Sequence, residues 1–198
     1  MKLQELIRRN RSFRRFQEDA AITRETLLEL IELARLSATA ANRQPLKFLP
    51  ACSPQTRELI FPCLGWAGYL RDWIGPADGE RPSGYIIILL DKCIHDRSDC
   101  DHGIAAQSIL LGATEMGLGG CMIGSIRKHE LQEKLSLPSH LEILLVIALG
   151  QPAETVDLEE VPSLDAIEYW RDSEDVHHVP KRSLEELIVD PPNFIEGE

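Results

Sequence analysis

Residues 101–125 read DHGIAAQSILLGATEMGLGGCMIGS, and this stretch gives the clearest indication of the fold class. Asp101 can serve as a helix N-cap, and Gly117 is the kind of residue that ends a helix. The residues between them are small or apolar on nearly every side, which predicts a helix buried from all directions. The next segment, GGCMIG at 119–124, predicts a short strand.

Strands and helices alternate on both sides of this stretch. The run YIIILLD at 85–91 is apolar throughout, as expected of a strand that is covered on both faces. Similar patterns predict strands at 46–52 and 141–149, and helices at 2–9, from 24 onward, from 54 onward and at 128–135. This alternation predicts a sheet covered by helices, an α/β or α+β sandwich. The tail at 151–183 is polar and is expected to be irregular, before a last short helix that begins at Ser183.

Length and composition indicate one globular domain. The 198 residues are 43% hydrophobic and 27% charged, which is the balance of a folded chain. No apolar run approaches the roughly 20 residues that span a bilayer, and the first residues lack the pattern of a secretion signal. We therefore expect a cytoplasmic protein with no membrane partner. The five cysteines form no CxxC pair, so we expect free thiols.

The charge of the chain is unevenly distributed. The formal net charge is −11, and residues 154–198 hold 14 acidic and 3 basic residues, while residues 1–153 hold 18 of each. An acidic total argues against nucleic acid as a partner, because that binding needs many cations to neutralise phosphates. Two basic clusters stand apart, RRNRSFRR at 8–15 and PKRS at 180–183. A charge run is often a solvated surface, but arginine, serine and a helix N-terminus together suit a phosphate.

Other motifs give little support to other chemistries. Gly117 and Gly119 form a GxG, but the third glycine of a dinucleotide-binding motif would fall at Met122, so that motif is rejected. No GxSxG nucleophile motif occurs. The loop CIHDRSDCDH at 93–102 holds possible zinc ligands at a nonstandard spacing, and a solvated turn is favoured over a metal site. We expect no metal ion and no catalytic side chain.

Asn42 and Gln44 lie between the second helix and the following strand. Each amide offers a donor and an acceptor, which suits the edge of a heterocycle. Asn42 could instead cap the preceding helix, as asparagine often does. Both interpretations are open from the residues alone.

Five segments, in this order, make the chain resemble the nitroreductase family of flavoproteins. They are RSFRRF at 11–16, ARLSATAANRQPLKF at 34–48, the stretch at 101–125, LLVIALGQPAE at 144–154 and PKRSLEELI at 180–188. The resemblance implies an α+β fold, a three-layer sandwich with a central mixed β-sheet flanked by helices. It also implies a single domain over 1–198, whose acidic extension at 154–198 closes on the cofactor site.

The resemblance further implies a homodimer that binds FMN at the subunit interface. Arg11 and Ser12 would hold the phosphate region, and Arg14 would lie near the N1 and C2 side of the ring. Ile123 and Gly124 would place backbone groups beside N5. The flavin of the partner subunit would be approached by Ser37, Ala38 and Thr39. The pyrimidine edge of the ring would be addressed by Asn42 and Gln44, and the phosphate would be enclosed by Lys181 and Arg182.

The implied activity is oxidoreduction in two half-reactions. NAD(P)H would give a hydride to flavin N5, and a small acceptor such as a nitroaromatic, quinone or enone would then take two electrons. The flavin supplies this chemistry, which agrees with the lack of a catalytic side chain. The alternative is a flavin-binding or flavin-consuming specialised member without general nitroreductase activity.

Overall fold

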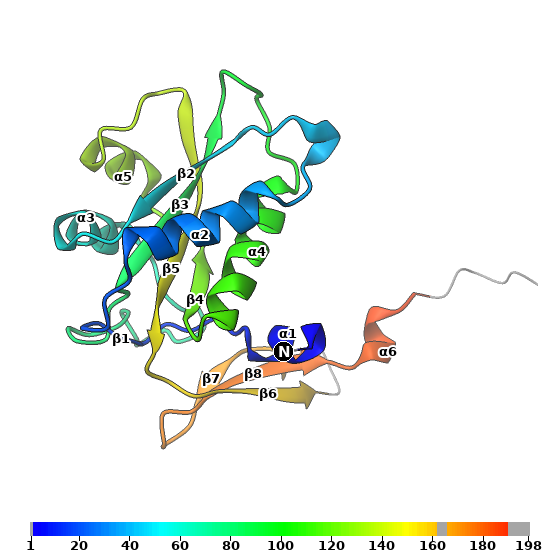
Figure 1. Cartoon of the computed structure of the whole chain (residues 1–198). Coiled ribbons are helices and arrows are strands. Elements are labelled where there is room, and N and C mark those ends of the chain that lie inside the picture. Colours follow the sequence, from blue (N-terminus) through cyan, green and yellow to red (C-terminus); the bar gives the residue numbers. More distant parts are fainter. Residues whose placement is uncertain (1, 162–165, 190–198) are drawn as a thin grey trace, which may run out of the picture. The chain divides into compact units, whose positions relative to one another are not determined.

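The structure is a computed structural model that describes residues 2–161 and 166–189. The chain divides into two compact units, Met1–Glu154 and Thr155–Glu198, which we call the N-terminal and C-terminal units. The helices of the N-terminal unit are α1 (Leu3–Arg9), α2 (Arg24–Arg35), η1 (Ala40–Asn42), α3 (Pro54–Ile60), η2 (Phe61–Cys63), α4 (Asp101–Glu115) and α5 (Lys128–Lys134). Its strands are β1 (Phe16–Gln17), β2 (Leu46–Ala51), β3 (Gly84–Asp91), β4 (Gly119–Ile123) and β5 (Leu141–Pro152) (Figure 1).

Five strands form the sheet of the N-terminal unit. The strand order is β1-β5-β3-β2, and β4 also pairs with β5. Each pairing between these named strands is antiparallel, and a bridge between Ser12 and Gly120 adds a parallel contact. Strand β5 has 12 residues, so it is long enough to pair with three neighbours and to form the centre of the sheet.

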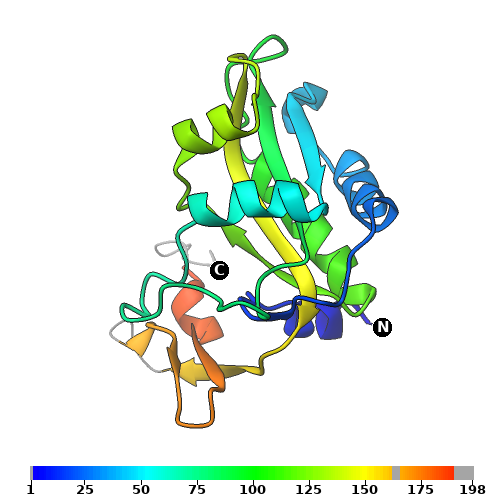
Figure 2. The ribbon, with the colours of Figure 1, turned by 90° about the vertical axis from the view of Figure 1, so that its left-hand side faces the viewer.

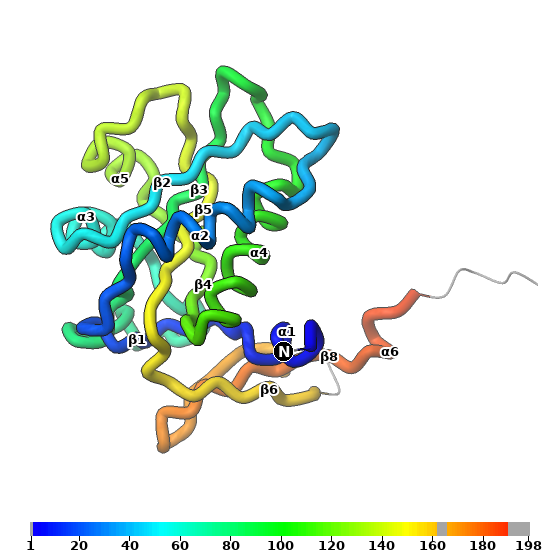
Figure 3. The backbone as a smooth tube through the Cα atoms, in the orientation of Figure 1, coloured from blue at the N-terminus to red at the C-terminus, as the bar shows by residue number. Residues whose placement is uncertain are grey.

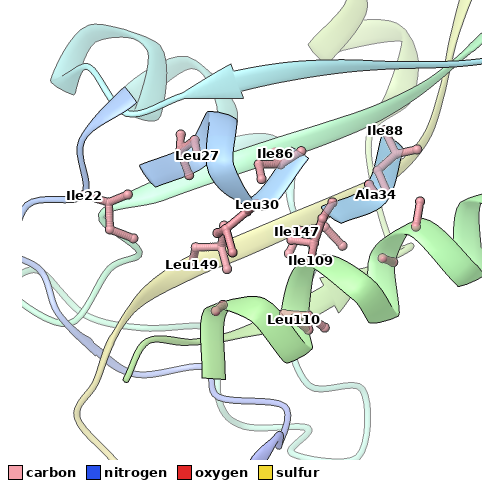
Figure 4. Close-up of a cluster of buried hydrophobic side chains, with 13 residues drawn as sticks. Ile22, Leu27, Leu30, Ala34, Ile86, Ile88, Ile109, Leu110, Ile147 and Leu149 are labelled. Atoms are coloured by element: carbon pink, nitrogen blue, oxygen red, sulfur yellow. The ribbon is translucent and has the colours of Figure 1, made fainter. Parts of the chain in front are cut away.

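Strand β3 supplies both faces of the sheet with apolar side chains. Ile86 and Ile88 belong to the core under α2 and α4, whereas Tyr85 and Ile87 belong to the core under α3 and α5. The alternation follows from the pleat, in which successive side chains point to opposite faces. All residues of β3 are buried, as predicted. Figure 4 shows the first core, with Leu30 of α2 against the sheet.

Helices therefore cover both faces of the sheet, which confirms the predicted α+β three-layer sandwich. Figures 1 and 2 show α2 and α4 on one side and α3 and α5 on the other. Local signals position two of these helices. The Thr23 hydroxyl accepts a hydrogen bond from the Thr26 amide at 3.1 Å at the start of α2, and Ser53 does the same for α3 ahead of Pro54.

Helix α4 differs from its prediction in two respects. Its N-cap residue is Cys100, and Asp101 is the first helical residue. The Asp101 carboxylate does not cap the helix but accepts a hydrogen bond from the Ala40 amide. One face is exposed at Gly103, Ile104 and Gln107, so the helix is not buried on all sides. The physical reason is that α2 and the sheet pack against the opposite face, while the side chains of this face remain exposed.

The C-terminal unit contains a small sheet where an irregular tail was predicted. Its elements are β6 (Val156–Val161), β7 (Trp170–Arg171), β8 (His177–Arg182) and α6 (Leu184–Leu187). Strands β6 and β8 pair in parallel, and β7 pairs with β8 in antiparallel fashion. The prediction was wrong because apolar and acidic residues alternate along β6, a strand pattern that the high charge concealed. Helix α6 begins as predicted, with the Ser183 hydroxyl accepting from the Glu186 amide at 3.4 Å.

Two further observations concern the cysteines and the lengths of the helices. All five cysteines are free thiols, as predicted. Within residues 2–161 and 166–189, no helix combines the length and the apolar character that a membrane crossing requires.

Candidate functional site

The basic N-terminal segment lies along strand β4. Ser12 forms a parallel bridge with Gly120, and the Phe13 amide donates to the Gly120 carbonyl at 3.0 Å. Glycine is needed here because a Cβ at Gly120 would collide with the backbone oxygen of Ala148. The close approach of backbone to backbone fixes residues 11–14 at the sheet.

Arg11 carries a partly buried guanidinium with unused hydrogen-bonding capacity. Its Nη2 donates to the Ile7 carbonyl at 2.7 Å, while its buried Nε has no hydrogen-bond partner among the described residues. Burial lowers the pKa of Arg11, because desolvation disfavours the charged form. A cation held this way favours an anionic ligand, which would restore the lost solvation.

Arg14 is positioned by hydrogen bonds from both its side chain and its backbone amide. Its Nη1 donates to the Ser12 carbonyl at 3.3 Å, and its amide donates to the Glu154 carboxylate. The same carboxylate accepts from the Arg15 amide at 3.0 Å. Glu154 therefore fixes the turn after Ser12, a role that sequence analysis missed because the two segments are 140 positions apart.

The end of β4 brings two more predicted residues to this side of the sheet. Ile123 is buried and pairs with Val146 of β5. Gly124 follows it and is exposed, and a Cβ built there would meet no atom within 4 Å. The strand end thus presents backbone groups beside open space. Arg11, Ser12, Arg14, Ile123 and Gly124 form the first group of candidate residues, which we call the β4 group.

A second group lines a cavity of about 140 Å³ between α2, β2 and α4. Its walls contain four of the predicted residues and are formed by Ala34, Arg35, Ser37, Ala38, Thr39, Gln44, Leu46, Phe48, Asp101 and Ala105. Asn42 lies in the same segment, within η1. Since α2 ends at Arg35 with Leu36 as its C-cap residue, the interpretation of Asn42 as the cap of that helix is wrong.

The segment that lines this cavity is conformationally strained. Ala41, Asn42 and Gln44 have φ values of 50°, 54° and 52°, in the left-handed region that residues other than glycine seldom adopt. Asp101 stabilises it, because its buried carboxylate accepts a hydrogen bond from the Ala40 amide at 2.8 Å. Strain of this kind is concentrated at ligand sites, where the surrounding structure maintains it.

Two hydroxyl groups at this cavity, those of Ser37 and Thr39, differ in whether they already form hydrogen bonds. Ser37 Oγ donates to the Leu33 carbonyl at 2.9 Å and lies 2.7 Å from Ser108 Oγ, so it already joins α2 to α4. Thr39 Oγ1 is buried and has no hydrogen-bond partner among the described residues. Thr39 is therefore the hydroxyl that remains available to a ligand in the cavity.

The cavity segment and the basic residues 11–14 lie toward opposite ends of α4 (Figure 1). The cavity segment is bonded to Asp101, the first residue of the helix, and Ser12 is bridged to Gly120, just beyond its last turn. A helix of 15 residues is about 22 Å long. One chain therefore does not bring the two groups to a single point.

Lys181 and Arg182 lie in β8 of the C-terminal unit. They pair in register with Glu160 and Val161 of β6, and the Lys181 side chain is exposed. Their predicted approach to a phosphate stays a prediction.

The described N-terminal unit is thus an α+β sandwich covered by helices, with a basic segment running beside strand β4. The chain belongs to the Nitroreductase family, which it matches over residues 7–68 and 91–151. The expected resemblance is thereby confirmed.

Individual relatives support the assignment. The FMN reductase (NADPH) of Bacillus subtilis (strain 168) is 28% identical over 163 residues, which cover 75% of this chain and 65% of the relative, slightly less than two thirds of its length. A nitroreductase family protein from Clostridium difficile 630 has the same fold, with a TM-score of 0.68 at 20% identity over 96% of this chain and 98% of that one. The NADPH:FMN oxidoreductase of Vibrio harveyi, solved in complex with NAD+, has a TM-score of 0.61 at 26% identity, covering 82% of this chain and 73% of that one.

Proposed function

We propose that this chain is an FMN-dependent NAD(P)H oxidoreductase that passes electrons to a small organic acceptor. The observation that carries the proposal is Arg11, whose buried, unpartnered Nε lies beside Ser12 at the edge of the sheet in a member of the Nitroreductase family. Two of the relatives named above, from Bacillus subtilis and Vibrio harveyi, carry both FMN and NADPH in their names, and the donor set of the β4 group fits the phosphate of FMN.

The phosphate end of FMN would be held by charge and by hydroxyl donation. Arg11 would offer Nε and its remaining guanidinium protons, and Ser12 would offer an exposed hydroxyl. Lys181 and Arg182 would supply further positive charge when the C-terminal unit closes on the site, as one domain over 1–198. The net charge of the tail is strongly negative, so these two cations are unusual in it.

The ring end would be oriented by fixed groups. Arg14 would stabilise negative charge on the N1 and C2 side, because its guanidinium is tied to the Ser12 carbonyl in advance. Ile123 and Gly124 would present backbone groups beside N5, where the absence of a side chain leaves room for a planar ring. When bound, FMN supplies the hydride chemistry, accepting from NAD(P)H and delivering to the acceptor in turn.

A homodimer would complete the site. Because Ser37, Ala38 and Thr39 lie toward the other end of α4 from Arg11 and Ser12, the copies of these residues in a second subunit would approach the flavin. Asn42 and Gln44 would address the pyrimidine edge or shape the segment that does. Exposed apolar side chains on α2, at its C-cap and on α4, namely Leu28, Leu36 and Ile104, support an interface formed by these helices.

Anaerobic mixing of the FMN-loaded protein with NADPH and, separately, NADH tests the proposal. We expect loss of the oxidised flavin absorbance with at least one donor, and its return when a nitroaromatic, quinone or enone is added. A flavin that stays oxidised with both donors would favour the flavin-binding or flavin-consuming alternative. A cytoplasmic location stays a prediction.

A further inference from the structure

Three side chains of types that bind metal ions lie close together where β3 ends and β5 begins. We call them the metal-ligand cluster, or constellation. One ligand atom from each of Asp91, Cys93 and His140 lies within 4.8 Å of the other two. Asp91 ends β3, Cys93 lies in the turn after it, and His140 directly precedes β5. Figure 3 shows the turn after β3 and the loop before β5 at the same end of the trace.

Backbone hydrogen bonds hold this constellation in place. The Lys92 amide donates to the His140 carbonyl at 2.9 Å, which joins the two loops. The Asp91 carboxylate accepts a hydrogen bond from the Cys93 amide at 3.0 Å, and the Asp91 amide donates to the Pro45 carbonyl at 2.9 Å. Asp91 is buried, with 8% of its surface exposed, while Cys93 and His140 are exposed. The site is therefore anchored on one side and accessible to an ion on the other.

The neighbouring groups of the same loops have other partners. His102 Nδ1 lies 3.1 Å from Ser98 Oγ, and His95 Nδ1 accepts from the Arg97 amide at 3.1 Å. The nearby cation Lys92 is paired with Glu142 at 2.8 Å. The structure thus selects Cys93 from the loop considered in the sequence and joins it to two residues outside that loop.

We infer that Asp91, Cys93 and His140 bind a divalent cation of borderline softness, with Zn²⁺ the best match. Carboxylate oxygen, thiolate sulfur and imidazole nitrogen together suit zinc, whereas Mg²⁺ and Ca²⁺ take oxygen ligands. Ligand atoms in a tetrahedral zinc site are about 3.5 Å apart, given the usual bond lengths, so small rotations of the two exposed side chains complete the site. A solvent molecule takes the fourth position.

Binding releases one proton and leaves the cluster near neutrality. The Cys93 S–H bond breaks, a zinc–sulfur bond forms, and the proton passes to solvent. The carboxylate of Asp91 and the new thiolate balance the two charges of the ion. The bound ion would cross-link the turn after β3 to the loop before β5.

A zinc competition assay tests the inference on the full-length protein with its flavin content unchanged. Chelator-treated protein is titrated against a chromophoric zinc indicator, and the melting temperature is recorded with and without zinc. The variants Cys93→Ser and His140→Asn remove one exposed ligand each. The matched controls Cys100→Ser and His95→Asn change the same residue types in the adjoining loop, outside the constellation.

We expect one zinc ion per chain, a higher melting temperature with zinc, and control variants that behave as the wild type. Each ligand variant should lose about tenfold or more in zinc affinity and should show a smaller zinc-dependent rise in melting temperature than the wild type at the same zinc concentration. Both ligand variants change exposed side chains, and their melting without zinc checks that they fold. A wild-type protein that binds no zinc, or a ligand variant with unchanged affinity, would overturn the inference.

Discussion

Arg11 and its neighbours show how single side chains prepare the β4 group for an anion. Arg11 is partly desolvated with an unpartnered Nε, whereas Arg15 lies 3.4 Å from the Glu80 carboxylate with 18% of its side chain exposed. Arg15 is therefore engaged inside the N-terminal unit. Two arginines four positions apart have different tasks, which the sequence cluster alone did not distinguish.

Replacing Arg11 by Gln should weaken FMN binding. A charged hydrogen bond contributes about 1.5–3 kcal/mol, so the dissociation constant should rise by about 10- to 100-fold. The matched control is Arg9→Gln, which removes an equal charge from the exposed surface of α1. Flavin fluorescence titration measures both. Equal weakening in the two variants would show that general charge, and not the position of Arg11, holds the cofactor.

Gly120 in strand β4 and Gly124 just after it have two different roles, which alanine substitutions separate. Gly120→Ala should lower the free energy of unfolding by about 1–3 kcal/mol, because its Cβ has no room beside Ala148 and Leu110. Gly124→Ala meets no neighbour within 4 Å, so stability should stay unchanged while FMN binding weakens. Urea unfolding and flavin titration give the two readouts. A destabilised Gly124→Ala, or one with full FMN affinity, would argue against its place beside the ring.

The small sheet of the C-terminal unit contains a histidine clamped between carboxylates. His178 Nδ1 lies 2.6 Å from Glu159 and Nε2 lies 3.1 Å from Asp172, and Trp170 stacks on the ring at 4.2 Å. The carboxylates, Asp172 first, raise the pKa of His178 above its ordinary value of 6.5. The same contact lowers the pKa of Asp172.

These shifts predict the pH dependence of the sheet. Because the folded pKa of His178 is raised, its contribution is complete below 6.5 and is lost as the pH rises through the folded value. Asp172 contributes above its ordinary pKa of 3.8 and loses its contribution as the pH falls below that. The protection of amides in β6 and β8 relative to their intrinsic exchange rates should therefore fall on the alkaline side, and His178→Gln should remove that fall. An NMR titration of His178 with an ordinary pKa would contradict this.

The sequence predicted the elements whose burial pattern is strong. The apolar run at 85–91 became β3, and Thr23 and Ser53 begin helices as expected. The C-terminal sheet was not predicted, because the acidic residues that alternate with apolar ones along β6 make this segment look like an irregular polar tail. Its pairing with β8, about 20 positions away, is also not visible in any local pattern. The candidate residues were proposed from composition and resemblance, and their roles stay predictions. Their division into two groups depends on contacts of Ser12 and Asp101 that no local pattern reveals.

At the scale of the whole molecule, the exposed face of α4 belongs to the proposed dimer interface. Ile104→Lys should shift the protein toward a monomer and lower its FMN content, because the charge would be buried at the interface and the site needs the second subunit. Ile74→Lys is the matched control, since Ile74 is 96% exposed in the loop between α3 and β3. Sedimentation and flavin-to-protein ratio measure the effect. A dimeric, fully loaded Ile104→Lys variant would place the interface elsewhere.

The visible absorption spectrum of the purified protein, before and after mixing with FMN, tests most directly whether this chain is a flavoprotein. We predict flavin bands and the release of FMN on denaturation, with one FMN per chain at saturation. A colourless protein that cannot be loaded with FMN would contradict the proposed function and the roles given to Arg11, Ser12 and Gly124.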